Sequence, residues 1–222
     1  MKKPAILSLV FLFNLSAFGQ GKAFIPEPGE GISFNSSSLI VVGASESYVP
    51  LWKANSQEFQ LLRENTIGLS HFGIAYGLGY SGHFYHGNLH IDAASDGQQT
   101  LENLDGQPLT SNRLATEYVD GILELRYRSN TNKNGRYMRI YVGGRSGYLT
   151  DSYSYLETEN YRVKYYNIGG FSTLRYGAYL KAGRGPFNLY YYYGLNPIVE
   201  SGVLVPELGA ATSQNIGLSI TL

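Results

Sequence analysis

The feature that most constrains this chain is a strict alternation of apolar and charged side chains along single segments. In YVDGILELRYRS, residues 118–129, apolar side chains alternate with four charged ones, Asp120, Glu124, Arg126 and Arg128. Successive side chains of a strand point to opposite faces, so this segment predicts a strand with one apolar and one charged face. A soluble core has no place for that charged face unless it meets water. The pattern favours a strand between lipid and a polar lumen.

Four further segments repeat this alternation. They are FGIAYGLGYSGHFY at 72–85, RYMRIYVGGRSGYL at 136–149, IGGFSTLRYGAYLKA at 168–182 and NIGLSITL at 215–222. Arg139, Arg145, Arg175 and Lys181 are predicted on their polar faces, opposite apolar side chains. About ten residues is the length that a tilted strand needs to cross a bilayer. Several membrane-spanning strands are therefore expected.

Four consecutive tyrosines in GPFNLYYYYGL, residues 185–195, place large half-polar rings on both faces of one strand. The flanking apolar residues assign the odd-numbered positions to the lipid side. Tyr191 and Tyr193 would then meet lipid, where aromatic rings are favoured near the membrane interfaces. Tyr190 and Tyr192 would point inward, where their hydroxyl groups can bond interior charges.

The connections between these segments alternate in length. NTNKNG and GRGP are short and rich in turn residues, whereas the polar segments at 86–114, 151–163 and 196–212 are long. This alternation is typical of an outer-membrane barrel. Two less regular segments, SSLIVVGAS and EFQLLRENTIGLS, complete the strand count. The chain is predicted to be all-β, an eight-stranded antiparallel transmembrane up-and-down β-barrel, a size at which side chains just fill the interior.

The N-terminus indicates export. Residues 1–20, MKKPAILSLVFLFNLSAFGQ, have the charged start, apolar run and small-residue end of a cleaved signal peptide, which leaves residues 21–222 as the barrel domain. The absence of cysteine excludes lipoprotein attachment, disulfides and thiolate metal sites. Cleavage leaves 15 basic and 17 acidic side chains, so no nucleic-acid partner is expected. These features predict location in the outer membrane, with its lipid as one partner.

The segments LELRYR, RIYVGGRSGYL, YLKAGRGPFNLYYYYGLNPI and NIGLSITL resemble the PorT-like outer-membrane β-barrel proteins of Gram-negative bacteria. The resemblance covers about residues 67–222 and is one of pattern, without a fixed catalytic motif. It implies an eight-stranded barrel in the outer membrane. It also implies a link to protein secretion, because the family's namesake takes part in a secretion apparatus, although most relatives have no assigned activity.

The predicted lumen-facing charges are the main candidate site. They are Asp120, Glu124, Arg126, Arg128, Arg139, Arg145, Arg175 and Lys181. Rings of charge set selectivity in pores, so these side chains would suit a narrow ion path. In so tight a lumen an unpaired charge is costly, and opposite charges would pair and plug it. The plug is the favoured interpretation.

A second candidate is HFYHGNLHID, which contains His83, His86, His90 and Asp92 at the extracellular end of the third strand. Together with Ser81, these residues would suit a nucleophilic hydrolytic site. A metal site is the alternative interpretation. No motif supports either. The histidines are therefore predicted to be solvated at the loop rim, and no catalytic residue, metal or cofactor is assigned.

The long polar loop at 87–114 lacks the calcium-loop spacing of acidic residues and is expected to be a flexible surface loop that can contact a partner. The predicted function is a non-enzymatic, membrane-anchored scaffold or accessory component that contacts a protein partner through its extracellular loops. Two alternatives stay open. One is a barrel enzyme that hydrolyses lipid or peptide, and the other is a narrow passive channel.

Overall fold

The computed structural model describes residues 31–68, 70–94, 97–107, 110–130, 137–200 and 205–222, so the predicted signal peptide lies outside the described residues. The elements are β1 (Ile32–Val42), β2 (Asn55–Thr66), β3 (Phe72–His86), β4 (Leu89–Ala93), β5 (Gln99–Asn103), β6 (Ser111–Arg128), β7 (Met138–Glu157), β8 (Arg162–Tyr166), β9 (Leu174–Arg184), β10 (Phe187–Gly194), the 3₁₀ turn η1 (Pro206–Leu208) and β11 (Thr212–Thr221). Among the described residues, no helix has the length and apolar character to cross a membrane.

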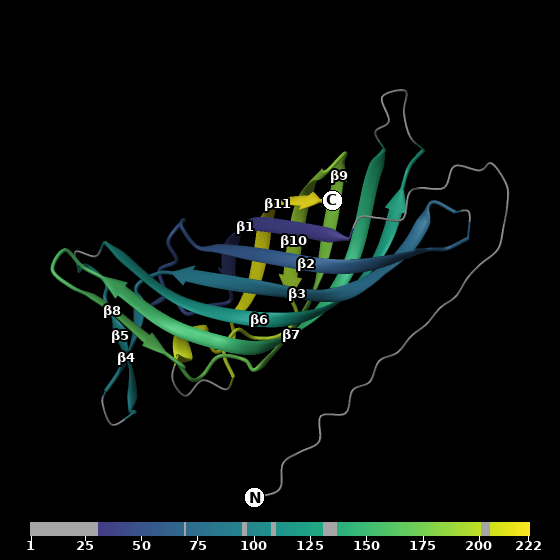
Figure 1. Ribbon diagram of the computed structural model, residues 1–222. Coiled ribbons are helices and arrows are strands. Elements are labelled where there is room, and N and C mark those ends of the chain that lie inside the picture. Colours follow the sequence, from purple (N-terminus) through teal and green to yellow (C-terminus); the bar gives the residue numbers. More distant parts are fainter. Residues whose placement is uncertain (1–30, 69, 95–96, 108–109, 131–136, 201–204) are drawn as a thin grey trace, which may run out of the picture.

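Eight of these strands close into one antiparallel ring (Figure 1). Its order is β1-β2-β3-β6-β7-β9-β10-β11, and the pairing of β11 with β1 completes it. That closing register runs from Ser33 opposite Thr221 to Val42 opposite Thr212. Ring strands that follow one another in the chain are neighbours throughout, which is up-and-down topology. The predicted eight-stranded barrel, including its two less regular first strands, is confirmed.

The ring has an apolar outer face and a polar inner face. In β10, Tyr191 and Tyr193 are 38% and 41% exposed, whereas Tyr190 and Tyr192 are 1% and 0% exposed. The four consecutive tyrosines therefore divide between the two faces as the alternation predicts. Exposed apolar side chains on all eight ring strands include Phe34, Leu61, Leu78, Leu125, Val142, Leu180, Leu189 and Leu218. This band is the lipid-facing surface.

Two strands are longer than the sequence predicted. β6 begins at Ser111 instead of near residue 118, and β7 continues to Glu157 instead of ending near residue 149. Beyond the membrane the outer side of a strand meets water, so the apolar-out alternation that marked these strands stops there. Segments predicted as polar loop are strand for this reason.

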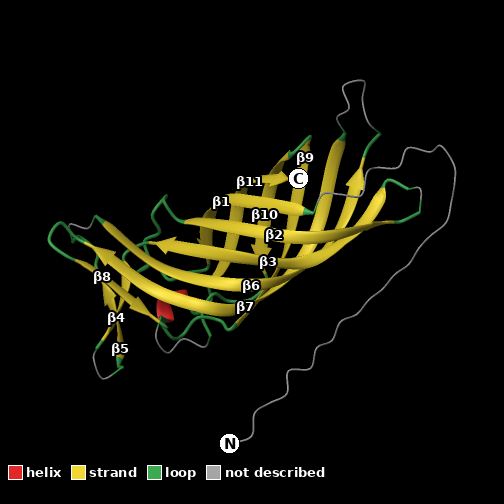
Figure 2. Ribbon diagram, viewed as in Figure 1, coloured by secondary structure: helices red, strands yellow, loops and turns green. Residues whose placement is uncertain are grey.

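Three short strands extend the same end of the barrel. β4 and β5 form a hairpin within the predicted loop 87–114, and β8 pairs with the outer part of β7. The expectation of a flexible loop is therefore wrong for β4 and β5. Figure 2 shows them together at the end of the barrel opposite the C-terminus. We call β4, β5, β8 and the outer parts of β6 and β7, residues 111–117 and 150–157, the outer platform.

A glycine allows the closing strands to approach each other. Gly217 of β11 is opposite Ser37 of β1, and a Cβ atom at position 217 would overlap the Ser36 carbonyl oxygen and the Ser37 backbone. Both obstructing groups are backbone atoms that take part in the sheet, so no side-chain rotation can relieve the overlap. Gly144 on β7 is different, because its nearest neighbour would be the Gly177 carbonyl oxygen at 3.9 Å.

We expect Gly217→Ala to weaken barrel closure and Gly144→Ala to leave it intact. The first substitution forces β11 and β1 apart, at a cost of about 1–3 kcal/mol, which is typical of overpacking. The measurement is the urea concentration at which the folded band is lost when unboiled protein is run on a detergent gel. Equal midpoints for the two variants would show that the close approach at Gly217 does not limit closure.

Candidate functional site

The lower lumen, near the short turns, is organised around Glu64 of β2. Its carboxylate accepts a hydrogen bond from Arg126 at 2.7 Å and pairs with Arg128 as well. Arg128 also donates its Nε hydrogen to the Tyr141 hydroxyl at 3.0 Å, and the Arg126 guanidinium lies 4.7 Å from the centre of the Tyr141 ring. One carboxylate and one aromatic ring thus hold two arginines.

The middle of the lumen is organised around Glu124 of β6. Its carboxylate accepts from Lys181 at 2.8 Å, from Arg126 at 2.7 Å and from the Tyr179 hydroxyl at 2.7 Å. Lys181 also donates to the Gln60 side-chain oxygen at 2.8 Å. Glu124, Arg126 and Lys181 are all 0% exposed, so water cannot replace these contacts.

The upper lumen holds two further ion pairs. Arg145 donates to Glu58 at 2.6 Å, and Arg175 donates to Asp120 at 3.1 Å. Tyr192, one of the four consecutive tyrosines, lies under Arg145, with 3.8 Å between the guanidinium and the ring centre. This distance is a cation–π contact, so the inward tyrosines supply both ring faces and hydroxyl groups to the network.

All eight charged residues predicted for the lumen are buried within it, between 0% and 5% exposed. Arg139 packs with its guanidinium 5.1 Å from the Tyr137 ring centre and 5.8 Å from that of Tyr141. The sequence reasoning missed two members, Glu58 and Glu64, which provide half of the four lumen carboxylates in the described ion pairs. The two glutamates belong to the inward-facing series Glu58, Gln60, Leu62 and Glu64 of β2, and this alternation could have predicted them. Polar residues on the outer face of the same strand obscured the pattern.

An apolar cluster closes the lumen at the extracellular end. The connections from β1 to β2, from β3 to β6, from β7 to β9 and from β10 to β11 all contribute to it, together with the ends of the ring strands beside them. Its buried members are Leu39, Tyr48, Ala54, Tyr85, Leu89, Ile91, Leu114, Ile168, Phe171, Ile198, Val199, Val205, Leu208 and Ala211. We call this cluster the apolar cap.

The apolar cap rests directly on the charged lumen. Tyr118, whose ring lies 4.5 Å from the Arg175 guanidinium, donates its hydroxyl hydrogen to the Ser172 carbonyl at 3.0 Å. Ser172 in turn donates to the Pro197 carbonyl at 2.7 Å, and the neighbouring Phe171 ring stacks on Tyr85 with 6.4 Å between centres. The loops are therefore fastened across the upper end of the lumen.

The prediction of solvated rim histidines is wrong. His83, His86 and His90 are 0%, 8% and 2% exposed, because the strands and loops of the extracellular end cover them. Ser81 donates to Asp120 at 2.6 Å and accepts from Arg175 at 2.8 Å, so it belongs to the lumen network and not to a histidine pair. Among the described residues, no group of three or more His, Cys, Asp or Glu side chains could hold a metal ion.

The outer platform carries a small open cleft. The β4–β5 hairpin places His90 opposite Glu102, and the β7–β8 pairing places Ser154 opposite Tyr165. His90 joins the two pairs, since its Nδ1 lies 2.8 Å from the Ser154 hydroxyl. His90 also lines a cleft of about 240 Å³, together with Asp92, Glu102, Leu156, Tyr161, Val163 and Tyr165.

A closed eight-stranded ring with an apolar exterior and a charged interior is the architecture of an outer-membrane barrel. The family model described as outer membrane protein beta-barrel domain matches residues 32–200. The chain belongs to this family. The barrel is accordingly a protein of the outer membrane, as predicted. No match was found among curated proteins or among solved structures.

We expect Glu124→Gln to destabilise the barrel by about 3–5 kcal/mol, because it leaves Lys181 and Arg126 buried without their shared carboxylate. Adding Lys181→Met to this variant should restore part of the loss, since it removes the cation whose described ion pair was lost, whereas Arg126 keeps Glu64. The measurement is urea unfolding in lipid vesicles. Glu157→Gln is the control, because Glu157 pairs with the exposed Arg162 and should not change the unfolding midpoint. Equal midpoints for Glu124→Gln and the control would contradict a structural role for the network.

We expect the outer platform to open more readily at acidic pH. Burial lowers the pKa of His90, although the facing carboxylates of Glu102 and Asp92 oppose the shift. The opened state therefore binds a proton first, and platform stability declines as pH falls below the ordinary histidine value of 6.5. Hydrogen exchange in β4 and β5, corrected for the intrinsic rate, should be faster at pH 5 than at pH 7.5. His90→Gln should reduce this difference, and an unchanged difference would exclude His90 as its source.

Proposed function

We propose that this outer-membrane barrel is a non-enzymatic, non-conducting anchor that presents its outer platform to a protein partner. The observation that carries the proposal is the continuity of β6 and β7, whose 18 and 20 residues run from the lipid-facing wall into the platform. A partner bound to the platform would thus be held by strands that are part of the barrel itself. Rigid presentation of this kind is what a scaffold requires.

The surface of the platform supports recognition of a protein. Tyr161 and Tyr166 are 55% and 57% exposed, beside the cleft and on the outer side of β8. Tyrosine rings offer a large contact area at low entropic cost and are enriched in protein interfaces. The resemblance of residues 67–222 to PorT-like barrels supports the narrower proposal that the partner belongs to a protein secretion system.

The contacts in the lumen favour a barrel closed by its own side chains over an ion channel. Glu58, Glu64, Asp120 and Glu124 are each engaged by a buried cation, and the apolar cap lies across the upper end. An ion would have to break these contacts and pass an apolar layer, both of which are unfavourable.

The extracellular end supports a binding role in preference to hydrolysis. Ser81 is 0% exposed and is held by Asp120 and Arg175. Ser154 does contact a histidine, but it is also 0% exposed and accepts a hydrogen bond from the Ile91 amide. A nucleophile must reach its substrate, which neither hydroxyl does in this arrangement.

We expect a photo-crosslinking amino acid at Tyr166 to capture a defined protein in intact cells. The same substitution at Leu218, on the lipid-facing surface, is the matched control and should capture no protein. The readout is a shifted band on immunoblots that depends on ultraviolet light, followed by mass spectrometry. Failure to capture a protein from Tyr166 or from Tyr161 would overturn the scaffold proposal.

The alternative functions have separate readouts. Discrete conductance steps in planar bilayers that change with Arg145→Gln would favour the narrow channel. Hydrolysis of membrane lipid or peptide that is lost in Ser81→Ala, with an unchanged gel shift on heating, would favour the enzyme. We expect neither result.

A further inference from the structure

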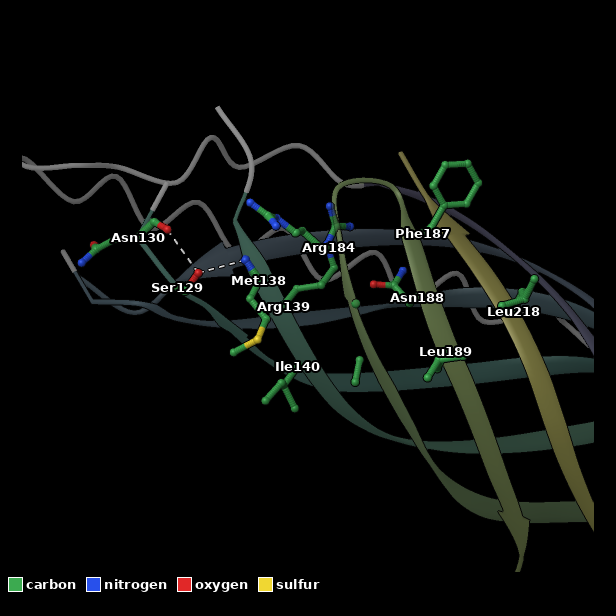
Figure 3. A pocket seen from close by; sticks show the side chains of 12 residues that line it. Ser129, Asn130, Met138, Arg139, Ile140, Arg184, Phe187, Asn188, Leu189 and Leu218 are labelled. Atoms are coloured by element: carbon green, nitrogen blue, oxygen red, sulfur yellow. Dashed lines mark hydrogen bonds between the residues drawn. The ribbon is translucent and has the colours of Figure 1, made fainter. Parts of the chain in front are cut away.

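A second surface feature lies at the opposite end of the barrel from the outer platform, on the lipid side. It is a hollow of about 690 Å³ beside the short turns (Figure 3). Its lining comes from β7, β9, β10 and β11 and from the residues that follow β6. The lining residues are Ser129, Asn130, Met138, Arg139, Ile140, Ala182, Gly183, Arg184, Phe187, Asn188, Leu189 and Leu218.

The hollow exists because one residue in a row of outward-facing residues has a small side chain. The strand register places Ile140, Ala182, Leu189 and Leu218 directly beside one another across four strands. Ile140, Leu189 and Leu218 are 39%, 69% and 59% exposed, so they stand out from the wall, whereas Ala182 has only a methyl group. The result is an apolar trough over Ala182, with a wall on either side.

A cation stands at the mouth of this trough. Arg184 lies two residues nearer the turn than Ala182 and faces the same side of β9, between Met138 and Phe187 in the register. Two residues of strand correspond to roughly 6.8 Å. Arg184 is exposed and forms no ion pair with any described residue, and the exposed amide side chain of Asn130 is at the same rim. In Figure 3 Arg184 lies beside the turn, with Ile140 and Leu189 farther along the strands.

The membrane determines what can occupy this hollow. The short turns of such barrels lie on the periplasmic side, so Arg184 is at the level of the headgroups of the inner leaflet and Ala182 is at the level of the acyl chains. Guanidinium groups bind phosphate with paired, charge-assisted hydrogen bonds. We propose that the hollow is a binding site for one phospholipid of the periplasmic leaflet, with an acyl chain over Ala182 and its phosphate on Arg184.

A second hollow provides the comparison. It measures about 480 Å³ and is bordered by Ala178, which lies four residues farther from the rim than Ala182 on β9. Its outward lining is apolar, with Leu123, Leu125 and Val142 among its members, and none of the arginines and lysines that the structure describes lines it. It offers a chain no headgroup contact, so it should exchange its lipid freely. Filling this hollow therefore removes a similar volume without touching the proposed site.

The test is native mass spectrometry of the full barrel extracted from the outer membrane in a mild detergent. We expect the wild type and Ala178→Leu to retain one phospholipid. Ala182→Leu fills the trough and Arg184→Gln removes the phosphate contact, so each should lower the retained fraction by roughly tenfold. Arg184→Lys keeps the charge and should retain more lipid than Arg184→Gln. The gel shift on heating verifies that each variant is folded.

Lipid added back to delipidated barrel identifies the contact. Dioleoyl phosphatidylglycerol should bind to the wild type, whereas dioleoylglycerol, which has the same chains without phosphate, should not. Equal retention by all variants would show ordinary fluid lipid and would overturn the proposal. So would equal binding of the two added lipids, or a dimer that Ala182→Leu dissociates, which would make the hollow a protein contact.

Discussion

The structure depends on placing charges where bulk water does not reach. Glu124 receives Lys181, Arg126 and the Tyr179 hydroxyl within 2.8 Å, and every one of these side chains is at most 2% exposed. A buried charge without a partner is strongly destabilising, and most of the lumen cations accordingly pair with a carboxylate. Several of these pairs join strands that are not neighbours in the ring, as Arg145 of β7 joins Glu58 of β2. The lumen is thus filled by side chains whose ion pairs connect strands across the barrel.

The membrane explains why the interior of the barrel can be polar. In a soluble protein the apolar side chains would have to form the core, but here they face lipid, and the interior is left for hydrogen bonds and ion pairs. The apolar cap is the exception. Beyond the membrane the loops meet water, so their apolar residues, such as Phe171 and Leu208, turn inward and close the lumen. One chain therefore has two cores of opposite character, and the change between them occurs near Tyr118.

The ring and its lumen could be predicted from the sequence because lipid imposes a two-residue period on every spanning strand. That period identified the eight lumen charges and the division of the four tyrosines. The two-residue period gave no information where lipid is absent. It therefore did not predict the outer parts of β6 and β7, the β4–β5 hairpin, or the burial of His83, His86 and His90. Glu58 and Glu64 were missed for a related reason, since Arg63 and Asn65 interrupt the outward face of β2. The pairing of particular charges depends on register around the ring, which no local pattern contains.

The lumen ion pairs and the outer platform are carried by the same two strands, β6 and β7. β6 carries Asp120, Glu124 and Arg126 in the lumen and, seven residues before Glu124, Glu117 in the platform. β7 likewise carries Arg145 in the lumen and Ser154, which meets His90, in the platform. β6 and β7 are hydrogen-bonded to each other over nearly their whole extent, so the ion pairs that hold their inner parts in the lumen also support their outer ends in the platform. A filled lumen suits the scaffold role proposed for this barrel, whereas a channel would need an open path.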